Sequence, residues 1–131
     1  MLINIKYMQN TKEKGEIGEE IACKYLVKHG YFIQERNYSG KCGEIDIIAV
    51  KDGILHFIEV KSVTNKVNYN GHSPEENVHD LKIKRLRRII QIYLNNNKYG
   101  LDAEFKFHII TVKYDSTTGK SIIKMLENII L

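Results

Sequence analysis

The sequence is poor in cysteine and proline, and it lacks a long apolar run. Its two cysteines, Cys23 and Cys42, form no CxxC motif, and the five histidines have none of the spacings found in zinc sites. We therefore expect two reduced thiols and no zinc centre. No segment approaches the roughly 20 consecutive apolar residues that a membrane-spanning helix requires. The first residues begin apolar and become charged, the reverse of a secretory signal peptide, so we expect a cytoplasmic protein that does not enter a membrane.

The length and composition predict a single domain over residues 1–131. Of these residues, 43% are hydrophobic, which suffices for one packed core, and 27% are charged. The formal net charge of +4 and the pI near 9.0 make the protein mildly basic. Such values suit a polyanionic partner without requiring one, because many proteins with no nucleic-acid role reach them.

Glycines and the single proline, Pro74, divide the chain into segments with helix-like or strand-like patterns. We predict helices over residues 12–29 and 77–97, and strands over residues 31–37, 44–50, 54–61, 104–112 and 121–126. Residues 37–43 and 62–76 are predicted loops, and we expect both to shape a substrate groove. The order α-β-β-β-α-β-β predicts an α/β fold with a central mixed β-sheet and a helix against each face.

A hairpin between the second and third predicted strands carries the sharpest signal. Asp-Gly at 52–53 between two β-branched runs is typical of a two-residue turn. That turn pairs Lys51 with Ile54, and the same register sets Asp46 opposite Glu59. Opposed residues have Cβ atoms about 4.5–5.5 Å apart, so two carboxylates would meet at close range. Facing like charges destabilise a sheet, but they become useful if a divalent cation lies between them.

The same face of the hairpin carries Glu44 opposite Lys61, because strand side chains alternate. The neighbouring positions are apolar, so the acids are expected to be buried, which is costly unless they are paired or bind metal. Carboxylates with waters and a substrate phosphate are the ligands that Mg²⁺ prefers. Lys61 could bind a phosphate or stabilise charge there. Alternatively, Lys61 neutralises these acids in a purely structural cluster.

Both predicted helices carry charged residues on their apolar faces. In the first helix Glu19 falls inside the apolar arc, where it either joins the acidic site or forms a buried salt bridge. In the second helix Lys82 and Arg85 fall within the apolar arc. They either extend to its rim or reach the acidic site or a phosphate. An outer stripe on this helix is either a solvated face or a track for a nucleic-acid backbone, and it consists of Lys84, Arg87 and Arg88.

The hairpin motifs resemble a known nuclease core. Gly43-Glu44-Ile45-Asp46 followed by Phe57-Ile58-Glu59-Val60-Lys61 resembles the PD-(D/E)xK nucleases, whose restriction-endonuclease-like fold is a mixed sheet flanked by helices. The whole chain is similar to the YraN-like family of predicted bacterial endonucleases, which are themselves similar to archaeal Holliday junction resolvases. The further parts of this resemblance are Gly18-Glu19 with Ala22, Gly30-Tyr31, Arg36-Asn37, and Val78 with Lys82 and Arg85-Leu86.

The resemblance implies a role for each of five residues. Asp46 and Glu59 would be metal ligands, together with the backbone carbonyl of Val60. Lys61 would be the catalytic lysine, and Glu19 the acid carried by the first helix.

The sequence departs from the family pattern at two places. Ile45 stands where the superfamily motif is named for proline. Lys106-Phe107-His108 stands where the family tends to have Arg-Phe-Asp, so one carboxylate is lost.

These observations predict a Mg²⁺- or Mn²⁺-dependent endonuclease that hydrolyses DNA phosphodiester bonds, with Asp46, Glu59, Lys61 and Glu19 at its active site. The residues expected to contact nucleic acid are Lys82, Arg85, Lys41 and Arg36. By analogy with resolvases, branched or junction DNA and a symmetric homodimer are further expectations. Two alternatives stay open: a module of the same fold that binds nucleic acid without cutting it, and an interaction protein whose acidic cluster is structural.

Overall fold

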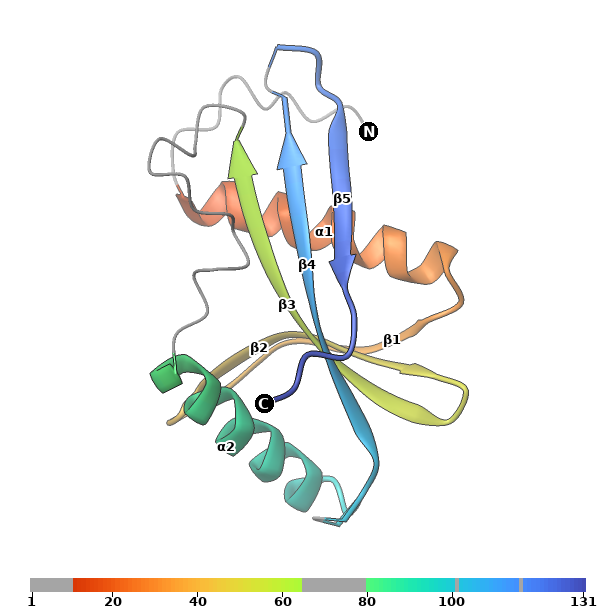
Figure 1. Cartoon of the computed structure of the whole chain (residues 1–131), viewed down its shortest axis with the longest axis vertical. Helices are drawn as coiled ribbons and strands as arrows, with labels where there is room; N and C mark the ends of the chain where they lie inside the picture. The colour runs from red at the N-terminus through yellow and green to blue at the C-terminus, as the bar shows by residue number, and fades with distance from the viewer. Residues whose placement is uncertain (1–10, 65–79, 101, 116) are drawn as a thin grey trace.

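A computed structural model describes residues 11–64, 80–100, 102–115 and 117–131. The elements follow the predicted order (Figure 1): α1 (Thr11–Lys28), β1 (Phe32–Gly40), β2 (Gly43–Lys51), β3 (Ile54–Thr64), α2 (Asp80–Asn96), β4 (Phe105–Tyr114) and β5 (Ser121–Leu126). No helix in this part of the chain is long and apolar enough to cross a membrane.

The five strands form one mixed sheet in the order β1-β2-β3-β4-β5. Every neighbouring pair is antiparallel except β3 and β4, which are parallel. A parallel pair needs a crossover connection, and α2 lies in that connection. This architecture confirms the predicted α/β class with a central mixed sheet flanked by helices.

The two helices cover opposite faces of the sheet (Figure 1). Successive strand side chains point to opposite faces, so Phe57 packs in the cluster under α2 while Ile58 packs in the cluster under α1. The α2 cluster also contains Leu86, Ile89, Ile90, Tyr93 and Leu94 from the helix itself. The α1 cluster contains Ala22, Cys23 and Leu26. The apolar arcs of both helices therefore face the sheet as their periodicity predicts.

The β2–β3 hairpin has the turn that Asp-Gly predicts. Asp52 and Gly53 both have positive φ, at 54° and 75°, as a type I′ turn requires. The predicted register is confirmed from Lys51 paired with Ile54 to Ile47 paired with Ile58. Within the described residues the pairing stops there, so the prediction that it continues to pair Asp46 with Glu59 and Glu44 with Lys61 is wrong.

The two strands diverge beyond that point because β3 has a second partner. It stays paired with β4 as far as Thr64 and Tyr114. β2 instead stays paired with β1 as far as Gly43 and Gly40. Figure 1 shows β1 and β2 turning away together while β3 continues beside β4. The sheet therefore splits between β2 and β3 just beyond the pair Ile47 and Ile58, where Asp46 and Glu59 follow in the two strands.

Two predicted loops differ from the structure. Residues 37–43 are mostly strand, since β1 runs to Gly40 and leaves only a tight turn before β2. Pairing with β2 overrides the turn-like composition, although Asn37 keeps a positive φ of 52°. Residues 62–64 of the predicted loop 62–76 belong to β3. The rest of that loop lies outside the described residues, as does Val78 at the predicted start of the second helix.

Candidate active site

Asp46 lies at the split in the sheet and is only 7% exposed. Its Oδ2 accepts a hydrogen bond from the backbone N–H of Val60 at 2.8 Å. The carboxylate thus satisfies an amide of β3 that has lost its strand partner at the divergence. Burial raises the pKa of Asp46 to about 7, and the nearby negative charge of Glu59 acts in the same direction. A charge at this position is costly to the folded protein at neutral pH.

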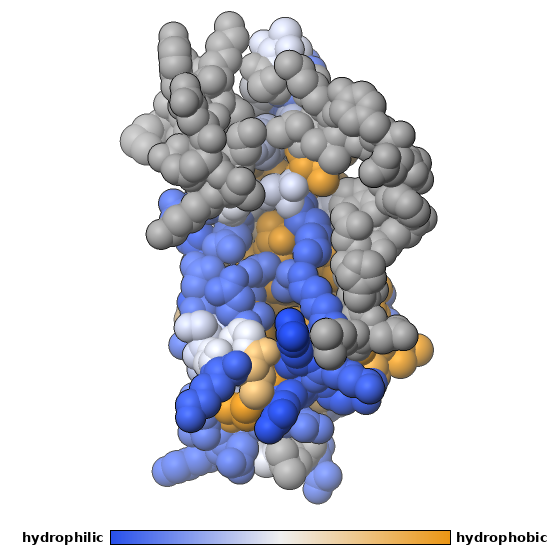
Figure 2. Space-filling view, turned by 90° about the vertical axis from the view of Figure 1, so that its left-hand side faces the viewer, coloured by the Kyte–Doolittle hydropathy of each residue, from blue (hydrophilic) through white to orange (hydrophobic). Residues whose placement is uncertain are grey.

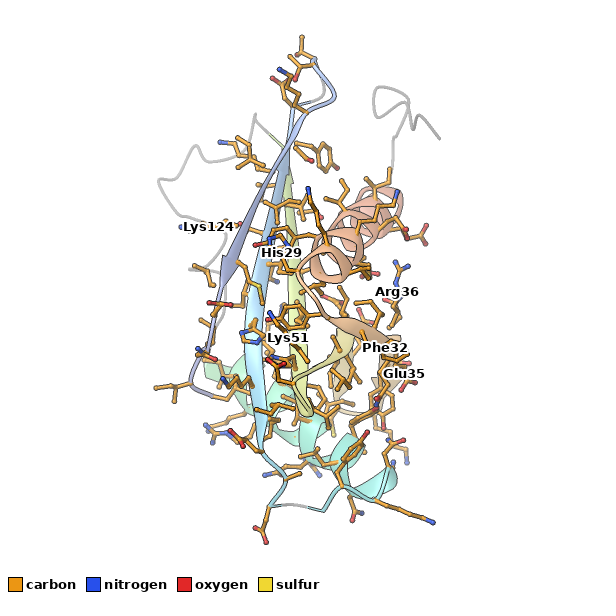
Figure 3. All side chains as sticks on the ribbon, turned by 90° about the vertical axis from the view of Figure 1, so that its right-hand side faces the viewer. His29, Phe32, Glu35, Arg36, Lys51 and Lys124 are labelled. Carbon is orange, nitrogen blue, oxygen red and sulfur yellow. The ribbon has the colours of Figure 1, made fainter. Side chains whose placement is uncertain are left out.

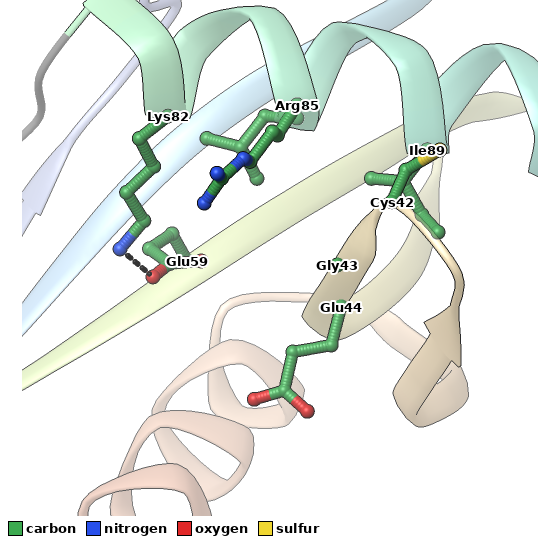
Figure 4. Close-up of a pocket in the computed structure, with 8 residues that line it drawn as sticks. Cys42, Gly43, Glu44, Glu59, Lys82, Arg85 and Ile89 are labelled. Atoms are coloured by element: carbon green, nitrogen blue, oxygen red, sulfur yellow. Dashed lines mark hydrogen bonds and ion pairs between the residues drawn. The ribbon is translucent and has the colours of Figure 1, made fainter.

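Glu59 is 8% exposed and is held by two lysines. Its Oε1 lies 2.8 Å from Nζ of Lys82 and 3.4 Å from Nζ of Lys61. Figure 4 shows Lys82 extending from α2 to this carboxylate. The position of Lys82 on its helix allowed it either to extend to the rim of the apolar face or to reach the acidic site. The structure shows that it reaches the acidic site. The ion pairs among the described residues reach Glu59 but not Asp46.

The two lysines differ in how the site affects them. Burial lowers the pKa of Lys61, and the neighbouring ammonium of Lys82 adds to this effect. Burial acts to lower the pKa of Lys82 as well, but the hydrogen bond and charge of Glu59, together with Lys61 and the charge of Asp46, outweigh burial in sum, so the pKa is raised. Of the two lysines, Lys61 therefore loses its proton more readily than Lys82.

The donor set fits a divalent cation that takes oxygen ligands. Two buried carboxylates repel each other here, and a cation between them would relieve that repulsion. The Val60 carbonyl points to the same edge of β3 as its N–H, toward Asp46, because a strand residue presents both groups on one side. No group of three or more His, Cys, Asp or Glu side chains among the described residues could alone hold a metal. Mg²⁺ commonly uses only one or two carboxylates and completes its shell with waters and phosphates.

Glu19 approaches this site from α1. Its negative charge contributes to the raised pKa of Asp46. Burial raises the pKa of Glu19 itself, against a hydrogen bond with Asn37 and the charge of Arg36. The helix can come this close because residue 18 is glycine: a Cβ there would lie 1.7 Å from Oγ of Ser62 on β3. Gly18 is a positioning feature that the charge pattern did not reveal.

Three of the four residues predicted to contact nucleic acid surround the acidic site. Lys82 and Arg85 line a cavity of about 270 Å³ with Glu59 (Figure 4). Lys41 lines an adjoining cavity that also includes Arg85. Arg36 is placed elsewhere. It lies beside α1 (Figure 3), where its guanidinium donates to Glu20 at 2.9 Å.

A buried histidine pair was not anticipated from the sequence. Nδ1 of His56 and Nε2 of His108 are 2.7 Å apart, and the backbone N–H of Asn128 donates to Nδ1 of His108 at 3.0 Å. The Nε2 of His108 must then carry its proton and donate to His56, so both rings are neutral. Burial lowers the pKa of His108 to about 4, and the adjacent His56 adds to the effect. The sequence shows only that each histidine is a polar residue within an apolar strand. Their contact depends on the parallel register between β3 and β4.

Known proteins resemble this chain over most of its length. A family model described as "Uncharacterised protein family UPF0102" matches residues 18–112. A UPF0102 protein of Campylobacter jejuni is 39% identical over 115 residues, which cover 88% of this chain and 91% of that protein. One from Helicobacter hepaticus is 43% identical over 98 residues, which cover 72% of this chain and 84% of the relative.

Among solved structures, Pyrococcus furiosus SfsA in complex with Ca²⁺ is 17% identical, with a TM-score of 0.43. The match covers 90% of this chain and 64% of that one. The family model spans the β2–β3 hairpin and α2, so it includes Asp46, Glu59, Lys61 and Lys82. On the strength of the family model and of relatives matched over most of their length, this chain belongs to the UPF0102 family.

Proposed function

We propose that this protein is an endonuclease that uses Mg²⁺ or Mn²⁺ to hydrolyse DNA phosphodiester bonds. The observation that carries the proposal is the buried pair Asp46 and Glu59 at the split between β2 and β3. A protein that needs only stability has little reason to keep two repelling carboxylates in an apolar sheet, with one pKa raised to about 7. The motifs that resemble the PD-(D/E)xK nucleases contain the same two acids and Lys61.

Asp46 and Glu59 would hold the metal with the carbonyl of Val60. When bound, the ion would polarise the scissile phosphate and lower the pKa of an attacking water. Asp46 must be ionised to act as a ligand, and its pKa of about 7 means that metal binding near neutral pH releases a proton. The hydrogen bond from the Val60 amide fixes the orientation of this carboxylate before any ligand arrives.

The two lysines have different parts in this proposal. Lys61 is half-buried and would place its ammonium against the negative charge that develops on the phosphate. Lys82 neutralises Glu59 at 2.8 Å, so a metal must compete with it for that carboxylate. Displacing Lys82 would free its ammonium to contact a phosphate in the cavity that both residues line. Glu19 would orient a water on the α1 side.

A module that binds nucleic acid without cutting it is the second candidate function. The observation in its favour is the double contact of Glu59 with Lys61 and Lys82, which satisfies that carboxylate without a metal. In that case the acids would be structural and the cationic side chains around them would bind phosphates. Branched DNA as the preferred substrate, and a homodimer that cuts two strands, rest on the resemblance to resolvases and remain predictions.

Cleavage of labelled duplex, single-stranded and four-way-junction DNA in Mg²⁺ or Mn²⁺ separates the two candidates. The nuclease proposal predicts cutting by the wild type, and loss of cutting on Asp46→Asn, Glu59→Gln or Lys61→Met. Glu104→Gln, at an exposed carboxylate away from the site, is the matched control and should cut like the wild type. Binding without cutting on every substrate and with both metals would favour the second candidate. Cutting that survives in Asp46→Asn would refute the assigned site.

A further inference from the structure

A basic cleft adjoins the acidic site on its α2 side. It lies between the β1–β2 turn and α2 and has a volume of about 560 Å³. Its cationic lining is defined by Lys41 from the turn and by Lys84, Arg85 and Arg88 from the helix. The face that α2 and this turn share carries strongly hydrophilic residues (dark blue, lower part of Figure 2). We infer that this basic cleft binds the sugar-phosphate backbone of one DNA strand as the strand runs to or from the carboxylates. This inference rests on the proposed function and deepens it.

The basic cleft and the acidic site are connected. The cavity of about 270 Å³ at Glu59 shares Cys42, Gly43 and Arg85 with the basic cleft. Gly43 contributes no side chain to the shared wall, and a Cβ placed there would meet nothing within 4 Å. A strand lying along Lys41 and Arg85 can therefore continue toward Glu59 without a side chain of residue 43 in its path.

The cations of the cleft have no partners in the described part of the chain, whereas Arg36 and Lys82 each form an ion pair there. Lys84 and Arg88 are four residues apart on α2, so they are neighbours on one helix face, and like charges at this spacing destabilise a helix. Lys41 adds another positive charge from a different element. Repelling cations that converge on a hollow surface are typical of a site that a polyanion neutralises.

The opposite flank of the acidic site lacks this excess of positive charge. The sequence of α1 has four lysines balanced by four glutamates, and Arg36 beside it is paired with Glu20, whereas α2 has five basic residues and one aspartate. A DNA backbone is therefore attracted more strongly on the α2 side. The charge distribution of the described residues therefore gives the strand a one-sided path, with the basic cleft holding phosphates to one side of the scissile bond.

The test compares two variants that each lose three positive charges, at different places on the surface. The cleft variant combines Lys41→Gln, Lys84→Gln and Arg88→Gln. The control variant changes exposed lysines that line none of these cavities, and it combines Lys24→Gln, Lys113→Gln and Lys120→Gln. Binding of a fluorescein-labelled single-stranded oligodeoxynucleotide is measured by anisotropy in EDTA, where no cutting occurs, over a series of salt concentrations. Circular dichroism and thermal melting verify that both variants fold.

The salt dependence gives the expected size of the effect. Each phosphate contact on a single strand contributes about −0.7 to the slope of log K against the logarithm of the salt concentration. Losing three contacts therefore makes this slope less negative by about 2. The same relation predicts roughly 100-fold weaker binding of the cleft variant in 0.1 M salt. The control variant should bind within about 3-fold of the wild type. Equal losses in the two variants would overturn the inference, because binding would then follow net charge and not the cleft.

Cys42 provides an independent readout inside the wild-type protein. It is partly exposed in the wall that the two cavities share, whereas Cys23 lies on α1 and is buried between that helix and the sheet. Saturating oligodeoxynucleotide should slow alkylation of Cys42 by N-ethylmaleimide at least about 10-fold, and this protection should be lost in the cleft variant at the same DNA concentration. Alkylation of Cys42 that is unchanged while the oligonucleotide is bound would overturn the inference, as would a wild type that binds no DNA.

Cleavage in Mg²⁺ or Mn²⁺ is scored separately, so the two proposals can fail separately. Binding that depends on the cleft, without cutting by the wild type, would remove the nuclease and leave the basic cleft as the binding surface. Cutting by the wild type, with cleft and control variants equal in affinity, would remove the cleft and leave the nuclease.

Discussion

Replacing Asp46 by asparagine should make the folded protein more stable at alkaline pH. A rise in the pKa of Asp46 from 3.8 to about 7 means that the folded state holds this proton more tightly than the unfolded state. Between these two values the folded state binds more protons, so the free energy of unfolding falls as the pH rises. At a pH above 7 the full difference between the two pKa values lowers the free energy of unfolding by about 4 kcal/mol. Asparagine keeps an oxygen to accept from the Val60 amide and has no charge to bury.

The expected gain is smaller than the full electrostatic difference. The amide group of the new side chain adds a buried donor, and leaving it unpaired would cost about 1–3 kcal/mol. We therefore expect Asp46→Asn to unfold with a free energy about 1–3 kcal/mol above that of the wild type at pH 8, and this advantage to fall with pH and reverse near pH 4, where the electrostatic gain is gone and the cost of the unpaired donor is left. Urea unfolding followed by circular dichroism across this pH range measures it, with the exposed Asp102→Asn as the control. A variant less stable than the wild type at pH 8, or a stability difference independent of pH, would show that burial does not raise the pKa of Asp46.

Three further predictions follow from contacts outside this carboxylate. Gly18→Ala should lower the free energy of unfolding by about 1–3 kcal/mol in urea titrations, because the added Cβ would clash with Ser62 on β3. Gly15→Ala is the control. Its Cβ would meet nothing within 4 Å, so this change should leave the free energy of unfolding the same or raise it by up to about 1 kcal/mol. In an Asp46→Asn background, stability should fall by about 3 kcal/mol as the pH drops from 6.5 to about 4, because His108 takes up a proton only in the unfolded chain over that interval. His108→Gln should remove most of that fall, and an unchanged pH profile would contradict a neutral histidine pair. Lys82→Met should tighten Mn²⁺ binding about 10-fold in calorimetry if this ammonium competes with the metal, and weaker binding would show that Lys82 supports the site.

Features that depend on local sequence were predictable. Asp52-Gly53 specifies its turn through the positive φ values of both residues, and that turn fixes the register as far as Ile47 and Ile58. The apolar periodicity of the two helices predicts which of their faces meet the sheet, and the order of elements predicts a mixed sheet with a helix against each face. The combination of motifs along the chain also identified the family, since the YraN-like proteins are the UPF0102 family to which the chain belongs.

Features that depend on long-range pairing were not predictable from pattern alone. The hairpin register cannot reveal that β3 prefers β4 beyond Ile58, so the divergence that separates Asp46 from a direct pairing with Glu59 was missed. The histidine pair depends on a parallel register set by a distant crossover. The helical pattern could not tell whether Lys82 extends to the rim of its apolar face or reaches the acidic site. Only the packing of α2 on the sheet places it at Glu59. Glu19 was identified from its position on the helix wheel, and Gly18 was part of the family resemblance, but the close approach of Gly18 to Ser62 on β3 was not predictable.

The proposed function depends on metal binding by the acidic site, which calorimetric titration with Mn²⁺ near pH 7 measures. We expect the wild type to bind Mn²⁺ and to release a proton from Asp46, seen as a heat that varies with the ionisation enthalpy of the buffer. Asp46→Asn and Glu59→Gln should abolish binding, while Glu104→Gln should not. If the wild type binds no Mn²⁺, whether or not DNA is present, or if the acid variants bind it as tightly as the wild type, then Asp46 and Glu59 do not form a metal site.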